Sequence, residues 1–149
     1  MPLSAIIDTN ALVAGLITNN PRSASAALID ALLAGRFTHF ASKESLAEAK
    51  DVLRILGGRD YHPFTEEQID RFCLGLELNS SVLQPTVAIS PAIPRDRTDA
   101  KWLALAMQSD ADYLVTNDRR HLLRLRRIGR TQIVTPAAFQ RELDRVTGD

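Results

Sequence analysis

The chain alternates short apolar segments of strand type with longer segments of helical periodicity along its whole length. Strands are expected at residues 3–7, 37–41, 81–84, 112–116 and 132–134. Helices are expected at residues 11–17, 24–33, 43–56, 66–78, 99–109, 118–125 and 137–146. This alternation predicts the α/β class, as a three-layer α/β/α sandwich in which helices cover both faces of a central, mostly parallel sheet.

The bulk properties are those of a globular protein of one domain, residues 1–149. Net charge is zero, so no global field steers the chain toward nucleic acid or a membrane. No apolar run approaches the roughly 20 residues of a membrane span, and no secretory signal precedes the first strand. The single cysteine, Cys73, cannot form an internal disulfide and is expected as a small core residue. A cytoplasmic location is therefore expected.

The first segment of strand type ends on a carboxylate. Residues 3–10 read Leu-Ser-Ala-Ile-Ile-Asp-Thr-Asn, so Asp8 follows the apolar strand directly. Asp118 follows a later strand in the same way, and Asp99 opens the helix before that strand. Ligands of open parallel sheets bind outside the carboxyl ends of the strands. We therefore expect these acids at one edge of the sheet, with Glu48 reaching it from the side.

Four carboxylates without a histidine or cysteine partner form a set of hard oxygen ligands. Such a set suits one or two Mg²⁺ or Mn²⁺ ions and does not suit zinc. Divalent ions at this position lower the pKa of a water molecule and stabilise the transition state of phosphoryl transfer. Asn10 and Thr116 are expected in or near the site, where they hold a ligand or a water by hydrogen bonds.

A simpler interpretation exists for three of these acids. Aspartate is a favoured residue at the start of a helix, and Asp8, Asp99 and Asp118, each taken alone, are explained as helix caps. Three of them at one edge favour the ligand interpretation, because clustered carboxylates repel one another unless a cation compensates.

The positive charge of the chain is unevenly distributed. Residues 119–141 contain seven arginines and no acid. A solvated surface and a polyanion-binding surface explain this segment equally well.

Four sequence motifs resemble the PIN-domain family in order and spacing, over nearly the whole chain. They are Asp8-Thr9-Asn10 after an apolar strand, residues 42–53 with Glu48, Asp99 ahead of Leu103-Ala104-Leu105-Ala106, and Ala111-Asp112-Tyr113-Leu114-Val115-Thr116-Asn117-Asp118. The last motif is the most specific. The small single-domain PIN proteins that act as toxins in prokaryotic type II toxin–antitoxin pairs, the VapC-like group, show the same arrangement.

The resemblance implies an Mg²⁺- or Mn²⁺-dependent endoribonuclease. It assigns the catalytic and metal-binding acidic quartet to Asp8, Glu48, Asp99 and Asp118. It also implies a small cognate antitoxin and a homodimer. In place of the family's frequent Asp-Pro-Asp-Asp, this chain has Asp96-Arg97-Thr98-Asp99, which leaves Asp96 as an extra or substitute ligand. The arginines expected to guide RNA are Arg97, Arg119, Arg120 and Arg124, although Arg97 is also explained as a solvated side chain.

Two other functions fit the same class of fold. A PIN-fold module without activity would hold RNA or a protein partner and bind Mn²⁺ weakly or not at all. A phosphotransfer domain of the aspartyl-phosphate type would need a second aspartate two residues after Asp8, where this chain has Asn10.

Overall fold

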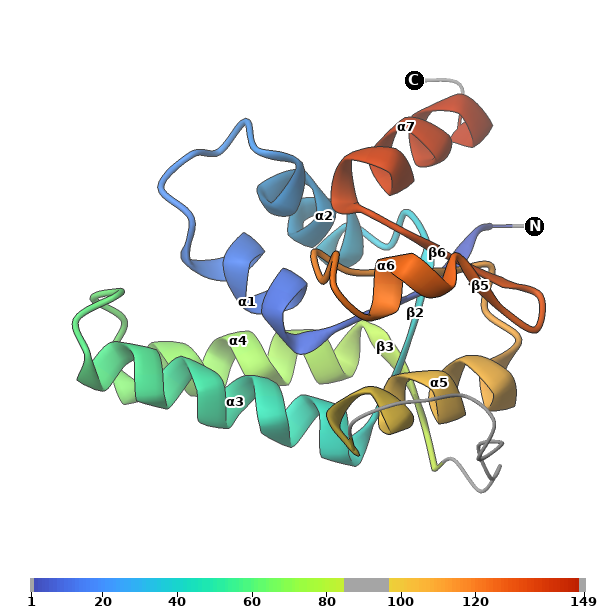
Figure 1. The fold of residues 1–149 in the computed structure, drawn as a ribbon. Helices are drawn as coiled ribbons and strands as arrows, with labels where there is room; N and C mark the ends of the chain where they lie inside the picture. Colours follow the sequence, from blue (N-terminus) through green and yellow to red (C-terminus); the bar gives the residue numbers. More distant parts are fainter. Residues whose placement is uncertain (1, 85–96, 148–149) are drawn as a thin grey trace.

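The computed structural model describes residues 2–84 and 97–147, and for residues 97–99 it describes the backbone alone. Figure 1 shows the arrangement of the helices and strands. The strands are β1 (Ser4–Ile7), β2 (Thr38–Ser42), β3 (Ser80–Leu83), β4 (Tyr113–Val115), β5 (Arg127–Ile128) and β6 (Thr131–Val134). The helices are α1 (Thr9–Ile17), α2 (Ala24–Leu33), α3 (Lys43–Gly58), α4 (Glu66–Leu78), α5 (Arg97–Ser109), α6 (Leu122–Leu125) and α7 (Pro136–Thr147).

The six strands form one sheet in the order β3-β2-β1-β4-β6-β5. All neighbouring pairs are parallel except β5 with β6, which is antiparallel. From β1 the chain proceeds to β2 and β3 on one side and then crosses to β4 on the other. The sheet therefore has its topological switch point between β1 and β4, where ligands of doubly wound sheets bind.

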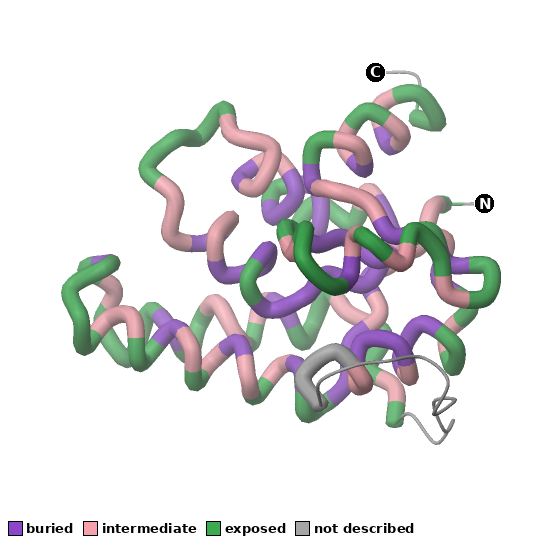
Figure 2. Tube along the Cα trace, viewed as in Figure 1, coloured by how far each residue is buried: buried purple, intermediate pink, exposed green. Residues whose placement is uncertain are grey.

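Alternate residues of the central strands enter two separate cores. Ala5 and Ile7 of β1 pack into the core formed with α1, α2, α3, α4 and α7, whereas Ile6 packs into the core formed with α5 and α6. Leu114 and Val115 of β4 divide in the same way. Figure 2 shows the buried strands in the middle of the molecule. The predicted three-layer architecture with a mostly parallel sheet is confirmed.

Local sequence signals fix the helix starts. Ser23 caps α2, and Thr65 with Gln68 forms the capping box of α4. Ser42 ends β2 and caps α3 through a reciprocal pair of hydrogen bonds with Ser45, both residues being buried. The buried cap holds the first turns of α3 against the carboxyl edge of the sheet. In the described residues, no helix combines the length and apolar character needed to cross a bilayer.

The expected helix at 118–125 is wrong in extent. Asp118 is followed by a turn, and α6 is a single turn of helix that begins at Leu122. The Asp118 carboxylate accepts hydrogen bonds from the backbone N–H groups of Arg120 and His121, both at 3.1 Å, and this local turn replaces the first turn of the expected helix. The prediction also lacked β5, which forms a tight hairpin with β6 around Gly129, whose φ of 58° is in the left-handed region.

A buried histidine joins β2 to the outer part of the sheet. His39 is paired with Ser80 of β3, and its Nδ1 lies 2.6 Å from the Ser80 hydroxyl oxygen. That hydroxyl donates its only proton to the carbonyl of Leu76, so Nδ1 must carry a proton and donate it to Ser80. Burial lowers the pKa of His39 from 6.5 to about 4, which keeps the ring neutral at physiological pH.

Candidate functional site

The candidate site lies at the switch point between β1 and β4. Ile7 and Val115 are register partners at the ends of these strands. The backbone N–H of Asp8 donates to the Val115 carbonyl at 3.1 Å, so the strand pairing extends to the first residue of the site. Asp8 and Thr116 are therefore held side by side by the backbone of the two central strands.

Asp8 is buried, with 5% of its surface exposed. Its Oδ1 caps α1 by accepting a hydrogen bond from the N–H of Ala11 at 2.9 Å. Its Oδ2 accepts a short hydrogen bond from the Thr116 hydroxyl. The cap interpretation is confirmed for Asp8, but it uses one oxygen only. A carboxylate has about four lone-pair positions, so a cap and a metal ligand are compatible roles for it.

Thr116 connects two of the predicted acids. Its side chain is completely buried, and its hydroxyl donates to Asp8 while accepting from the backbone N–H of Asp118 at 2.9 Å. One hydroxyl thus fixes both the orientation of the Asp8 carboxylate and the path of the chain into Asp118. This is the supporting position predicted for Thr116, although its role in metal binding stays a prediction.

Asp118 is half-buried at the carboxyl end of β4, and its carboxylate accepts hydrogen bonds from backbone N–H groups of the turn that follows. Asn10 is exposed on the first turn of α1. No hydrogen bond joins the Asn10 side chain to the residues that the structure describes, so its predicted support of Asp8 stays a prediction. Thr9, for which the sequence predicts no role, is buried, and its hydroxyl oxygen has no hydrogen-bond partner among the described residues.

Glu48 lies on the second turn of α3 and is half-buried. Its carboxylate forms an ion pair with the ammonium of Lys101 on α5. The sequence predicts Glu48 at the edge of the site but gives no signal for Lys101. Lys101 lies two positions after Asp99, so the ion pair brings α3 to the part of α5 that holds the third predicted acid.

The remaining predicted residues are placed only in part. Asp99 is the third residue of α5, and Arg97 is the first; the described structure includes the backbone of both. The Lys101–Glu48 ion pair places the start of α5 beside α3, and the predicted position of the Asp99 carboxylate at the site stays a prediction. Asp96 lies outside the described residues.

The described residues contain no group of three or more His, Cys, Asp or Glu side chains arranged to hold a metal ion. Of the predicted quartet, only Asp8, Glu48 and Asp118 have described side chains. All four are carboxylates, which are suitable ligands for Mg²⁺ or Mn²⁺. In the described structure the ammonium of Lys101 is the counter-ion of Glu48. By this test of ligand chemistry, the residues fit a hard divalent cation.

Six exposed arginines follow the site along the chain. They are Arg119, Arg120, Arg124, Arg126, Arg127 and Arg130. Within the described structure, the only ion pair in this group joins Arg130 to Asp112 at 3.0 Å. The segment therefore presents uncompensated guanidinium groups beside Asp118.

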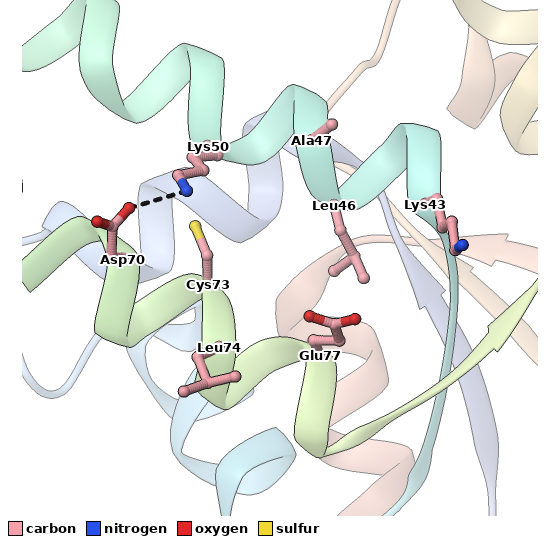
Figure 3. Close-up of a pocket in the computed structure, with 8 residues that line it drawn as sticks. All are labelled: Lys43, Leu46, Ala47, Lys50, Asp70, Cys73, Leu74 and Glu77. Carbon is pink, nitrogen blue, oxygen red and sulfur yellow. Dashed lines mark ion pairs between the residues drawn. The ribbon is translucent and has the colours of Figure 1, made fainter.

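A separate groove lies between α3 and α4, which run side by side in Figure 1. It has a volume of about 380 Å³. Figure 3 shows its lining, with the Lys50–Asp70 ion pair of 2.8 Å across it and Cys73 beneath. The ion pair lowers the pKa of Asp70, and burial raises the pKa of Cys73, which therefore stays a thiol. None of the predicted acids lines this groove.

The structure is that of a doubly wound α/β protein with a buried carboxylate, Asp8, at the switch point of its sheet. The chain belongs to the PIN-domain family: a family model described as PIN domain matches residues 4–120. The match includes all four predicted acids. PIN domains are generally nucleases, bind nucleic acids and use divalent metals. No curated protein matches the chain.

Proposed function

We propose that this protein is an Mg²⁺- or Mn²⁺-dependent endoribonuclease that hydrolyses phosphodiester bonds of RNA. The observation that supports this most is the hydrogen bond from Thr116 to Asp8 at the switch point of a PIN-domain sheet. It holds a buried carboxylate where ligands of such sheets bind. We propose Asp8, Glu48, Asp99 and Asp118 as the metal-binding and catalytic acids, with Asp96 as a substitute ligand.

Each part of the site has a proposed task. The four acids hold one or two divalent ions, and Thr116 keeps the buried Asp8 carboxylate oriented toward them. When bound, the ions supply Lewis-acid stabilisation of phosphoryl charge and activation of water. Asn10, exposed on the first turn of α1, is proposed to hold water or substrate by hydrogen bonds. The close packing of Thr116 and Asp8 limits motion of the carboxylate.

Metal removal tests this function directly. Purified protein is expected to cleave single-stranded RNA in Mn²⁺ or Mg²⁺ and to stop cleaving when EDTA removes the ion. Adding the ion back is expected to restore cleavage, because EDTA removes the metal and leaves the carboxylate ligands intact. Cleavage that continues unchanged in excess EDTA would show that the proposed chemistry is wrong. Binding of RNA without cleavage, and without Mn²⁺ binding by calorimetry, would favour the inactive module.

We propose that Arg97, Arg119, Arg120 and Arg124 guide the RNA backbone to the acids. Each phosphate contact to single-stranded RNA adds about 0.7 to the slope of log affinity against log salt. The double variant Arg120→Gln, Arg124→Gln is therefore expected to bind an oligouridylate more weakly, with a slope that is smaller by about 1.4. Fluorescence anisotropy in EDTA measures binding without cleavage. Arg71→Gln on α4 is the matched control, and equal slopes in all three proteins would refute these contacts.

We further propose that residues 1–149 form one PIN domain that acts in the cytoplasm as the toxin of a toxin–antitoxin pair. The resemblance of the motifs to VapC-like toxins supports this role. Leu74 and Leu78 of α4 are 55% and 74% exposed, an apolar surface suited to a homodimer or to a small antitoxin. A short reading frame for a DNA-binding protein immediately upstream of the gene would support the assignment, and growth unaffected by expression of the protein alone would contradict it.

A further inference from the structure

The ion pair between Lys101 and Glu48 stands at the candidate site but has no place in the predicted acidic quartet. Lys101 lies on the second turn of α5, and its ammonium contacts Oε2 of Glu48 on α3. The side chains of Lys101 and Glu48 are 19% and 32% exposed, respectively. The ammonium also lies 5.4 Å from the centre of the Trp102 ring. It is thus held by a carboxylate and an aromatic face together.

Glu48 depends on this contact for charge compensation. Its Oε2 is completely buried and accepts no hydrogen bond of ordinary geometry from the described residues. A buried carboxylate oxygen without a hydrogen bond is costly unless a cation lies beside it. The Lys101 ammonium supplies that cation. Because Oε2 is buried, the exposed part of the Glu48 side chain belongs to its other atoms.

Lys101 also borders a cavity. With Ser42, Gln84 and Ala104 it lines a cavity of about 170 Å³, and the fifth lining residue is Glu44. Glu44 is exposed and lies one turn before Glu48 on α3, so the two carboxylates occupy neighbouring positions on the same helix. A long, flexible lysine side chain that leaves Glu48 therefore has a second carboxylate beside the cavity that it already lines.

We propose that Lys101 is the resident counter-ion of Glu48 in the metal-free protein, and that a divalent cation binds by displacing its ammonium toward Glu44. The inference rests on the proposed function, since it assumes that Glu48 is a metal ligand. An ammonium and a divalent ion compete for one carboxylate, and a fixed positive charge within a few ångströms of the ion weakens its binding. Lys101 therefore lowers the affinity of the site for metal while it stabilises the metal-free state.

Calorimetric titration with Mn²⁺ tests this competition. Lys101→Met keeps an aliphatic side chain against Trp102 and removes the ammonium, and it is expected to bind Mn²⁺ about tenfold more tightly than the parent protein. Lys43→Met is the matched control: Lys43 is the first residue of α3, is exposed, and forms no ion pair with Glu48 in the described structure. Lys43→Met is expected to bind within about twofold of the parent.

Thermal unfolding supplies a second readout. In EDTA, Lys101→Met is expected to unfold at a lower temperature than the parent, because Glu48 has lost its counter-ion. Added Mn²⁺ is expected to raise its unfolding temperature more than that of the parent. Glu44→Gln is expected to weaken Mn²⁺ binding in the parent and to have a smaller effect in the Lys101→Met background, where no ammonium has to be relocated.

The outcomes separate this inference from the proposed function. If the parent binds Mn²⁺ and Lys101→Met binds it equally or more weakly, the competition is refuted and the metal site stands. If Lys43→Met gains as much as Lys101→Met, the effect is one of general charge and the inference is refuted. If neither the parent nor Lys101→Met binds Mn²⁺, both proposals fail. Lys101→Gln gives the same comparison if the methionine variant does not fold.

Discussion

Asp8→Asn is expected to reduce metal-dependent cleavage of RNA by at least about 100-fold, because even partners outside the ligand shell of a metal cost 10- to 100-fold when they are removed. The fold is expected to survive. Asparagine is as good an N-cap as aspartate, so its side-chain oxygen can keep the bond from the Ala11 N–H. The loss of one carboxylate from an acidic edge also relieves repulsion in the metal-free protein. Cleavage assays in Mn²⁺ and thermal unfolding by circular dichroism measure the two effects.

Comparing Asp8→Ala with Asp8→Asn separates the cap from the charge, because alanine removes both whereas asparagine removes only the charge. Asp8→Ala is expected to have a free energy of unfolding about 1 kcal/mol lower than that of Asp8→Asn, with equally low cleavage. Asp99→Asn is expected to abolish cleavage as well. Full activity in Asp8→Asn and Asp99→Asn would contradict the proposed ligand set. An Asp8→Asn protein that is unfolded would show that the carboxylate is needed mainly for the fold.

Acid is expected to destabilise the protein through His39. Its pKa is about 4 in the folded state and about 6.5 when unfolded, so between these values the unfolded chain binds more protons. The free energy of unfolding is therefore highest above pH 6.5 and falls as the pH drops to 4, by about 3 kcal/mol from this residue alone. Protonation of Nε2 would place a charge where the described structure offers it no acceptor.

His39→Asn is the comparison that isolates this effect. The asparagine amide lies at the position of Nδ1, so it can still donate to the Ser80 hydroxyl, but it does not titrate. Urea unfolding at several pH values between 7 and 4 is expected to show a steeper loss of stability in the parent than in the variant. The carboxylates titrate in both proteins, so their contribution cancels when the free energy of unfolding of the variant is subtracted from that of the parent at each pH. Equal pH profiles would show that the His39 ring is already charged or accessible in the folded protein.

The sequence predicts most of this fold because its signals are local. Ser23, Thr65 and Pro136 mark helix starts by capping chemistry and backbone restriction, and the structure places α2, α4 and α7 there. Strand β5 was missed because two residues carry no periodicity. The helix start at Asp118 was wrong because an aspartate side chain can close a turn as readily as it caps a helix. Strand order also has no local signal, so the neighbours of β1 come from the structure alone.

The site, too, was predictable only in part. The position of Asp8 after a strand predicts either a helix cap or a metal ligand. The structure shows that one oxygen of the carboxylate caps α1 while the other accepts a hydrogen bond from Thr116. Lys101 was missed because a lysine on an amphipathic helix is ordinarily solvated. Only the approach of α3 to α5 brings it to Glu48, and that approach depends on tertiary packing. The reach of Asp99 toward Asp8 stays a prediction.

The hydrogen bond between Thr116 and Asp8 joins residues that are 108 positions apart in the chain. During synthesis, domains fold as units, and a ribosome adds about 5–20 residues each second. A nascent chain that ends before β4 has its first acid but neither the strand that fixes it nor Asp118. The proposed metal site can therefore form only after most of the polypeptide has left the exit tunnel. If the protein has the proposed ribonuclease function, this order of synthesis would leave it unable to cleave RNA for most of the time that it is being translated.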